Sequence, residues 1–315
     1  MQARAHAAAF LRWSKYILRK GLPDLVFFFE GGLGDQLLCS ALVREIRRRE
    51  AKNIWLMTNA AELFARNRDI RLVLPYDIWL FPWLRLNGTP ARQVCYQDLV
   101  PGEPRHAPLR EHCIAAMCRR AGISGKVALR PYLPSVETGD RLSRRSRPRI
   151  AIQSSCMNAR YPMANKQWPV DRFQQVVDSL VAEADFVQVG VASDPPLQGA
   201  DDMRGKVGYL DAARVLRDSD LFVGLVGFLM HLARAVECPG VIIYGGRETP
   251  ETTGYTCNIN LATSPPCAPC WYYSHCDYDR MCMEEISVAS VVQAIRRLLA
   301  SRVSRPLEVD FAEID

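Results

Sequence analysis

The sequence contains no long hydrophobic run, and this absence excludes several classes of protein at the outset. No apolar stretch reaches the roughly 18 residues that are needed to cross a bilayer. The first residues also lack the charged region, long apolar core and small-residue cleavage site of a secretory signal. We therefore expect a cytoplasmic protein, in which the 11 cysteines serve as thiols or metal ligands and not as disulfides.

A large excess of charge is also missing, so charge alone assigns no partner. The net charge is +6 over 315 residues, and 49% of the residues are hydrophobic, as in folded soluble proteins. Arginines gather over 44–49 and 141–149, but no basic stripe is interleaved with aromatic residues, so we expect no nucleic-acid partner. The two arginine runs fit a solvated surface, or attraction for an anionic substrate or an anionic membrane face.

The segment 8–20 has the pattern of an amphipathic helix. Its cations surround an apolar face, which is made of Phe10, Leu11, Ser14, Ile17 and Leu18. Such a helix can lie at a membrane interface, or it can pack on the body of the protein, which is the favoured interpretation. A peripheral contact with the cytoplasmic face of the inner membrane stays open.

Strands and helices alternate in two halves of the chain. The first half has expected strands at about 24–29, 53–57 and 71–74, and expected helices at about 34–49, 60–65 and 107–121. The second half has expected strands at about 149–153, 186–190, 221–223 and 241–244, and expected helices at about 171–182, 211–217 (capped by Asp211), 230–236 and from 287. The region 76–105 has no assignment.

A linker rich in proline and arginine, at 131–148, separates the two halves. This pattern predicts an α/β protein with two doubly wound domains that face each other across a cleft. We expect an N-terminal domain at 1–140, a C-terminal domain at 149–300 and an acidic tail at 301–315.

A glycine-rich turn follows the first expected strand and carries a carboxylate. The apolar run 25–29 leads into Gly31-Gly32-Leu33-Gly34-Asp35, after which an amphipathic helix begins. A phosphate would meet bare backbone at such a turn. A phosphate-binding turn would avoid a negative charge. Asp35 therefore indicates a catalytic role for this turn and not phosphate binding. Asp35 can also cap the helix, and the helix dipole is expected to keep it ionised and weakly basic.

Three segments narrow the interpretation when they are taken in order. They are GLGDQLL at 32–38, KQWP at 166–169, and DLFVG at 220–224 with MHLARA at 230–235 and YGG at 244–246. In this order and spacing they resemble glycosyltransferase family 9, which includes the heptosyltransferases of lipopolysaccharide assembly. The resemblance extends over about residues 25–299. It implies a GT-B fold, in which two Rossmann-like domains face a central cleft.

The resemblance also implies roles on both sides of that cleft. Inverting glycosyl transfer needs a base for the acceptor hydroxyl, and Asp35 matches the family's catalytic position, in an acceptor-side loop with Gly32, Gly34 and Gln36. Lys166 matches the lysine that faces the donor phosphates, whose growing charge is stabilised by cations and helix amides. The other expected donor-binding residues are Ser154, Ser155, Gly227, His231, Tyr244, Gly245 and Gly246. His231 is explained equally well as a hydrogen-bonded core residue.

One segment departs from the family's pattern. Members usually have Asp-Ser/Thr-Gly ahead of the Met-His pair, where this chain has Val226-Gly227-Phe228. An acid that helps to hold the donor is therefore missing, and Phe228 replaces a glycine that allows close backbone approach. Either the donor differs from ADP-heptose, or the loop binds it differently, or the protein binds a nucleotide sugar without catalysis.

Four cysteines lie close together near the C-terminal end, with the spacing Cys-x2-Cys-x5-Cys-x5-Cys; they are Cys267, Cys270, Cys276 and Cys282. Four thiolates can form a tetrahedral site for structural zinc or iron, with His275 as a further donor. Similar runs occur in the family, and the related autotransporter heptosyltransferases resemble iron-binding examples. The cysteines can equally remain thiols or form a disulfide on oxidation.

The sequence therefore predicts an inverting glycosyltransferase without a catalytic cofactor. It would move a heptose or similar sugar from a nucleotide-diphosphate donor to a lipopolysaccharide or another surface glycan. One alternative is a protein O-heptosyltransferase of the autotransporter type, which the cysteine run suggests. The other alternative is an inactive nucleotide-sugar-binding protein, which Val226 and Phe228 suggest.

Overall fold

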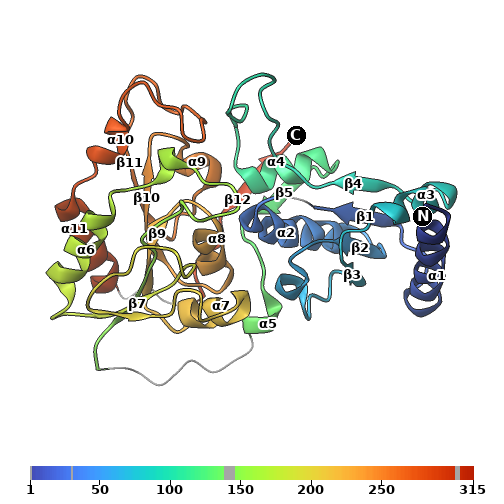
Figure 1. Cartoon of the computed structure of the whole chain (residues 1–315), viewed down its shortest axis with the longest axis horizontal. Coiled ribbons are helices and arrows are strands. Elements are labelled where there is room, and N and C mark those ends of the chain that lie inside the picture. Colours follow the sequence, from blue (N-terminus) through green and yellow to red (C-terminus); the bar gives the residue numbers. More distant parts are fainter. Residues whose placement is uncertain (1, 30, 138–145, 302–305) are drawn as a thin grey trace.

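The computed structural model describes residues 2–29, 31–137, 146–301 and 306–315, which form two parallel β-sheets side by side (Figure 1). The first sheet has the strand order β3-β2-β1-β4. Its strands are β1 (Leu25–Phe28), β2 (Ile54–Met57), β3 (Leu72–Leu74) and β4 (Ala91–Gln93). β1 lies inside the sheet and is apolar on both faces, as expected of a strand covered on both sides.

Helices cover both faces of the first sheet. Alternate residues of β1 and β2 point to opposite sides, so Val26 and Trp55 belong to one core and Phe27 and Leu56 to another. The first of these faces is covered by α1 (Gln2–Lys20), η2 (Ile78–Leu80) and α3 (Phe81–Leu86). The second is covered by α2 (Leu33–Arg49) and α4 (Cys113–Arg120).

α1 packs on the body of the protein, as the favoured interpretation of segment 8–20 predicts. Ala9 and Trp13 are buried, and the Trp13 ring meets the edge of Trp55 with 5.4 Å between ring centroids. Arg12 forms an ion pair with Asp77 at 2.6 Å. The helix is thus held by the buried stripe of Ala9 and Trp13, with Tyr16 and Ile17 packed beside it, whereas Leu11 and Leu18 of the expected apolar face are exposed.

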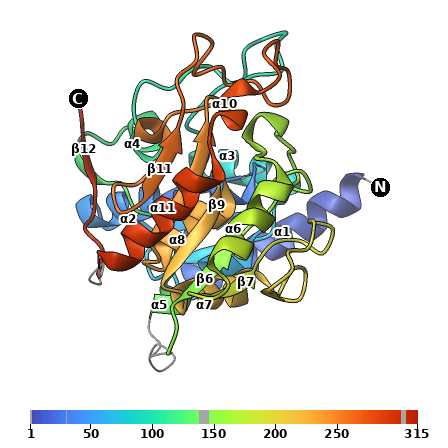
Figure 2. The same ribbon diagram turned by 90° about the vertical axis from the view of Figure 1, so that its left-hand side faces the viewer.

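The second sheet has the strand order β11-β10-β9-β6-β7-β8, with all neighbouring strands parallel. Its strands are β6 (Arg149–Ile152), β7 (Asp185–Gln188), β8 (Ala200–Asp202), β9 (Leu221–Leu225), β10 (Gly240–Gly245) and β11 (Ile259–Ala262). Helices α6 (Val170–Leu180) and α11 (Val288–Ala300) cover one face, as Figure 2 shows. Helices α7 (Tyr209–Arg217) and α8 (Phe228–Ala235) cover the other.

The two halves share one hydrophobic core. α2 of the first half packs against α8 of the second, and one buried cluster includes side chains of both helices. Near the end of the chain, β12 (Phe311–Ile314) returns to the first half and pairs antiparallel with β5 (Gly125–Ala128). Part of the segment expected as an acidic tail is therefore a strand, with Glu313 opposite Lys126.

The strongly patterned elements lie where the sequence predicts them, with small shifts at their ends. The expected cap of α7 is wrong, because Gly208 is the N-cap and Asp211 lies in the first helical turn. The helix expected at 107–121 begins only at Cys113, after the N-cap His112. The expected helix at 60–65 is a 3-10 turn, η1 (Ala61–Phe64). Arg141, Arg144 and Arg145 of the expected linker lie outside the described residues.

Over the described residues, none of the helices has the length and hydrophobicity that a membrane span requires. The remaining short elements are α5 (Pro134–Glu137), η3 (Ala164–Lys166), α9 (Pro250–Thr253) and α10 (Met281–Glu284).

Candidate active site

The candidate site lies where the N-terminal ends of α2 and α8 meet, beyond the carboxyl ends of β1 and β9. α2 begins at Leu33 after the N-cap Gly32, and α8 begins at Phe228 after the N-cap Gly227. Glycine at position 34 lets the two helices approach closely. A Cβ atom there would lie 3.2 Å from Cδ2 of His231 and 3.5 Å from the backbone of Phe228.

Asp35 is half-buried in the first turn of α2, where Tyr96 contacts it from the segment after β4. The Tyr96 hydroxyl donates a hydrogen bond of 2.8 Å to Oδ1 of Asp35. Burial raises the pKa of Asp35, and the Tyr96 hydrogen bond, the Lys166 charge and the Gly32 backbone only partly offset it. The direction of this shift is opposite to the one expected from the helix dipole alone, because desolvation outweighs the N-terminal end of the helix, and the ionisation of Asp35 stays a prediction.

The capping and catalytic interpretations of Asp35 are compatible. The N-cap residue itself is Gly32, which offers no side chain, and its backbone donates a hydrogen bond to the Asp35 carboxylate. This is the reciprocal half of a capping box, in which an acid in the first turn serves the N-cap amide. The same carboxylate also accepts the bond from Tyr96, so it is held in a fixed orientation.

A buried ion network from the second half lies beside Asp35. Lys166, at the end of η3, forms an ion pair with Glu248, and Arg247 Nη1 reaches the same Glu248 oxygen at 2.9 Å. The Glu248 side chain is only 4% exposed and that of Lys166 only 12%. Burial alone would raise the pKa of Glu248, but the charges of Lys166 and Arg247 overcome it and lower the pKa to about 2. The network thus holds the Lys166 side chain in place beside Asp35.

His106 of the first half extends this network across to the second half. Arg247 donates to Nδ1 of His106 at 3.3 Å, and Nε2 of His106 lies 3.1 Å from the hydroxyl of Tyr273. Burial and the neighbouring Arg247 charge lower the pKa of His106 to about 4. A neutral imidazole at this place accepts from the guanidinium and so fixes its orientation toward Glu248.

His231 and His112 are also neutral and hydrogen-bonded. Nδ1 of His231 lies 2.7 Å from the Tyr255 hydroxyl, and burial, followed by the charges of His112 and Lys166, lowers the pKa of His231 to about 3. His112 accepts from the Ile114 backbone and bonds the Gly254 carbonyl at 3.0 Å. The geometry of His231 is that of a satisfied core residue, placed beside Gly34 at the contact between the halves.

The serines expected on the donor side are engaged elsewhere. The hydroxyl of Ser154 donates to the Pro195 carbonyl at 2.9 Å, and that of Ser155 accepts from the Met157 backbone at 3.1 Å. Neither hydroxyl bonds Lys166 among the hydrogen bonds of the described residues. Both serines therefore shape the loop after β6, and their expected role as phosphate donors stays a prediction.

The expected turn after β10 is a close-packed corner. Gly245 has a φ of +61°, and a Cβ atom there would lie 2.4 Å from Sδ of Met283, so only glycine fits without strain. Tyr244 is fully buried, with its hydroxyl near Thr253. Gly246 leads directly to Arg247 and Glu248, so this turn acts by placing the ion network. Gly227 differs, because a Cβ atom there would meet only open space.

Gln36 holds the acceptor-side turn in shape. Its side-chain nitrogen donates to the Gly31 carbonyl at 3.0 Å, and its oxygen accepts from the Thr58 hydroxyl. The side chain is buried, so it supports the loop from the protein interior.

Sequence reasoning missed several residues that contact the expected ones, namely Tyr96, His106, Arg247, Glu248, Tyr255 and Tyr273. Arg247 and Glu248 carried a usable signal, because they follow directly on a buried strand and a glycine turn. Tyr96 and His106 lie in or just after the region 76–105, where no periodic pattern marks the elements that position them.

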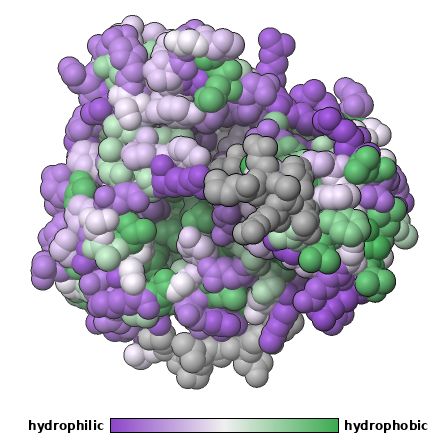
Figure 3. Space-filling view, turned by 45° about the vertical axis from the view of Figure 1, so that its right-hand side comes forward, coloured by the Kyte–Doolittle hydropathy of each residue, from purple (hydrophilic) through white to green (hydrophobic). Residues whose placement is uncertain are grey.

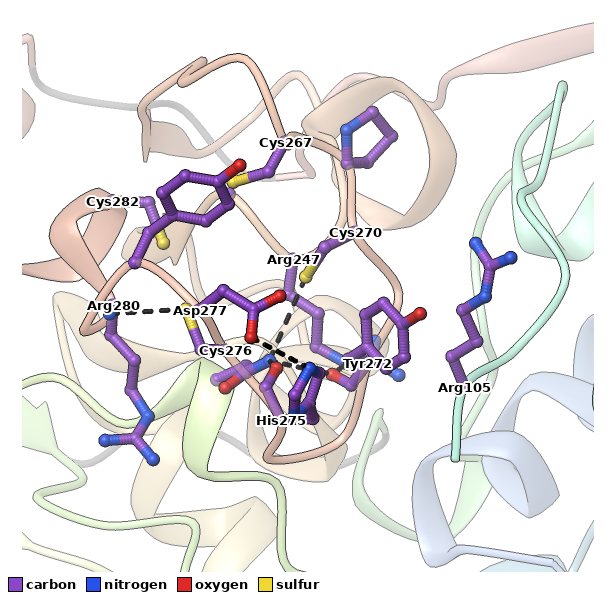
Figure 4. A pocket seen from close by; sticks show the side chains of 14 residues that line it. Arg105, Arg247, Cys267, Cys270, Tyr272, His275, Cys276, Asp277, Arg280 and Cys282 are labelled. Atoms are coloured by element: carbon purple, nitrogen blue, oxygen red, sulfur yellow. Dashed lines mark hydrogen bonds and ion pairs between the residues drawn. The ribbon is translucent and has the colours of Figure 1, made fainter. Parts of the chain in front are cut away.

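The four cysteines line one cavity of about 170 Å³ between the two halves (Figure 4). Arg105 of the first half borders it, together with Arg247 and Arg280. All four are free thiols. The Arg280 backbone donates to Sγ of Cys276 at 3.3 Å.

The donors around this cavity are not placed to hold a metal ion. Among the described residues, no three His, Cys, Asp or Glu side chains are arranged to hold one. His275 instead lies 3.3 Å from Asp277, with both side chains largely exposed. The cysteines thus share a cavity, but their present side-chain positions do not form a coordination site.

No protein-family model and no curated protein matches the sequence. Solved structures do match the fold. The iron-containing dodecameric glycosyltransferase TibC from enterotoxigenic E. coli has a TM-score of 0.67 at 18% identity, over 89% of this chain and 77% of TibC. A family 9 glycosyltransferase from Veillonella parvula has a TM-score of 0.61 at 13% identity, over 89% of this chain and 97% of that one.

The ADP-heptose lipopolysaccharide heptosyltransferase II of E. coli has a TM-score of 0.58 at 16% identity, over 89% of this chain and all (100%) of that one. These likenesses confirm the predicted GT-B fold, with its two Rossmann-like domains.

Proposed function

We propose that this chain is an inverting glycosyltransferase that takes a heptose or similar sugar from a nucleotide-diphosphate donor. One observation carries the proposal: a half-buried carboxylate with a raised pKa, Asp35, lies within the electrostatic reach of a buried lysine from the other half, Lys166. A base for the acceptor and a cation for the leaving group are the two groups that this transfer needs. The GT-B fold supports the same division of labour.

In this proposal, residues 1–140 hold the acceptor and residues 149–300 hold the nucleotide sugar. Asp35 removes the acceptor proton as the oxygen attacks the anomeric carbon, and its raised pKa makes it a stronger base than an exposed aspartate. The diphosphate leaves toward Lys166 and the free N-terminal amides of α8, where Gly227 leaves open space. Glu248 holds Lys166 in place until the donor phosphates supply a competing negative charge.

We propose a lipopolysaccharide or other surface glycan as the acceptor, at the cytoplasmic face of the inner membrane. A protein acceptor is the second candidate, and the likeness to TibC together with the cysteine run favours it. A non-catalytic protein that binds a nucleotide sugar is the third, because Val226 and Phe228 replace the expected acid and glycine.

We also propose that the four-cysteine cavity holds structural iron or zinc once its side chains turn inward. The shared cavity and the backbone hydrogen bond to Cys276 support this assignment. Bound metal would fix the loop beside Arg247 and would take no part in the transfer. Anaerobic purification should yield about one equivalent per chain. Less than a fifth of that, roughly, would contradict the proposal.

The activity test starts with a screen of nucleotide sugars for thermal stabilisation, followed by calorimetry on the best binder. Transfer to candidate glycan and protein acceptors is then measured for the wild type, D35A and K166A. We expect D35A to lose roughly 10²- to 10⁴-fold in transfer rate while it still binds the donor, and K166A to lose donor affinity as well.

The variants separate the candidates. Unchanged transfer in D35A and K166A would contradict the catalytic assignment. Donor binding without transfer to any acceptor would favour the non-catalytic candidate. No binding of any nucleotide sugar would reject the transferase altogether.

A further inference from the structure

The outward side of α1 carries hydrophobic side chains that the fold does not cover. Leu11 is 69% exposed and Leu18 is 87% exposed. They are seven residues apart, so they lie on one side of the helix. The buried stripe of Ala9 and Trp13 faces the sheet on the other side. The two leucines are therefore free of the core that holds the helix.

Cations surround these leucines. Lys15, Arg19 and Lys20 are exposed, and within the described ranges no carboxylate forms an ion pair with them. The segment 2–20 contains no aspartate or glutamate. We call the surface formed by Leu11, Lys15, Leu18 and Arg19 the α1 face.

α3 extends this surface. The ring of Phe10 packs against that of Trp83 at a tilt of 48°, with 4.7 Å between ring centroids, which places α3 beside α1. The end of α3 adds the exposed Arg85 and Leu86, of which Leu86 is 75% exposed. Figure 3 shows hydrophobic and hydrophilic side chains intermingled on the side of the molecule that carries α1.

We propose that the α1 face binds an anionic lipid surface. Exposed leucines between exposed cations are the composition of interfacial helices, in which apolar side chains enter the acyl boundary and the cations meet lipid phosphates. A second copy of the chain fits less well, because a two-fold contact would place the same cations opposite one another without acids between them.

This surface is distinct from the candidate active site. α1 covers one face of the first sheet, whereas α2, which carries Asp35, covers the opposite face. Lipid binding and donor binding are thus separable properties, and each can be lost without the other. The α1 face would hold the enzyme at a membrane with its cleft free.

The test uses full-length protein and sedimentation with vesicles. One set contains phosphatidylcholine alone, and another contains about 30% phosphatidylglycerol. We expect binding only to the anionic vesicles, with at least about tenfold loss when the salt is raised from about 0.1 to 0.5 M. L11S/L18S and K15E/R19E should each lower the partition coefficient at least about tenfold.

V181S and R297E are the matched controls, because Val181 and Arg297 are exposed on the second half. Both should bind vesicles as the wild type does. Binding of L11S/L18S at the wild-type level, or equal binding to neutral vesicles, would overturn the proposal.

Sedimentation velocity tests the alternative, in which a second copy of the chain covers the α1 face. A wild-type oligomer that L11S/L18S converts to monomer would assign the α1 face to a second copy and overturn the lipid assignment. Donor calorimetry on the same samples keeps the two proposals apart. Retained donor binding with no vesicle binding rejects the α1 face alone, and the reverse result rejects the transferase alone.

Discussion

Two neighbours shift the pKa of Asp35 in opposite directions, and each can be replaced separately. The Tyr96 hydroxyl stabilises the carboxylate and lowers its pKa, whereas the negative charge of Glu248 raises it. A base must be ionised, so the transfer rate should rise with pH through the pKa of Asp35. Each neighbour therefore helps to set the pH at which the transfer rate rises, which is the acidic limb of the pH–rate profile.

We predict that Y96F and E248Q move this limb in opposite directions. Y96F removes a hydrogen bond to the charged form, so the limb moves to higher pH. E248Q removes a like charge and frees the charge of Lys166, so the limb moves to lower pH. Initial rates with saturating donor between about pH 4 and 9 measure both shifts.

Y278F is a suitable control, because Tyr278 is exposed in the cysteine loop and should leave the limb in place. Shifts of Y96F and E248Q in the same direction would show that the rate-limiting ionisation belongs to another group.

At the scale of elements, His112 joins the start of α4 to the second half. Its Nδ1 accepts from the Ile114 backbone, and its Nε2 bonds the Gly254 carbonyl. The contact with Ile114 requires the neutral ring, because a protonated ring has no acceptor, whereas the Nε2–H donates to the Gly254 carbonyl. Burial lowers the pKa of His112 from 6.5 to about 4.

We predict that this histidine makes the fold sensitive to acid. Between pH 6.5 and 4 the unfolded chain takes up a proton that folded His112 resists, so stability falls as the pH falls. H112N keeps a capping side chain but cannot titrate. Its free energy of unfolding should change less with pH, by up to about 1.4 kcal/mol per unit. Urea unfolding at several pH values measures this slope.

H112A provides the comparison, since it loses both the cap and the titration. It should show the same shallow slope and should also be less stable at neutral pH, by about 1 kcal/mol. A wild-type slope in both variants would mean that other groups carry the acid sensitivity.

Elements with a strong local pattern could be predicted from the sequence. β1 and α2 combine an apolar run, a glycine turn and an inward stripe, and each lies where expected. β4 and β8 could not be found, because they are short and largely polar edge strands. Their pairing with β1 and β7 is a product of tertiary structure, which leaves no periodic signal in three residues.

The residues of the candidate site also fall into two groups, those that the sequence could identify and those that it could not. Asp35 and Lys166 lie in ordered motifs, so the sequence could name them. Tyr96 and His106 reach the site only because β4 and the following segment pass along the first sheet. The exposed face of α1 was visible as a pattern, but its buried stripe depends on Trp55 of another strand.

At the scale of the whole molecule, contacts at several places hold the two halves together. α2 packs on α8 beside the candidate site, and β12 carries the end of the chain back to β5. Asp310, just before β12, also accepts a hydrogen bond of 3.1 Å from the Thr256 backbone of the second half. The distance between the acceptor side and the donor side is therefore set by contacts and not by a linker alone.

We predict that G34A slows transfer by about tenfold while donor affinity stays within about a factor of two. The new Cβ would lie 3.2 Å from His231, so α2 must move away from α8 and carry Asp35 with it. The donor contacts of the second half are left intact. G208A is the control, because a Cβ at Gly208 meets no atom within 4 Å. Steady-state kinetics and donor calorimetry measure both quantities, and equal losses in the two would mean that the substitution disturbs the donor pocket itself.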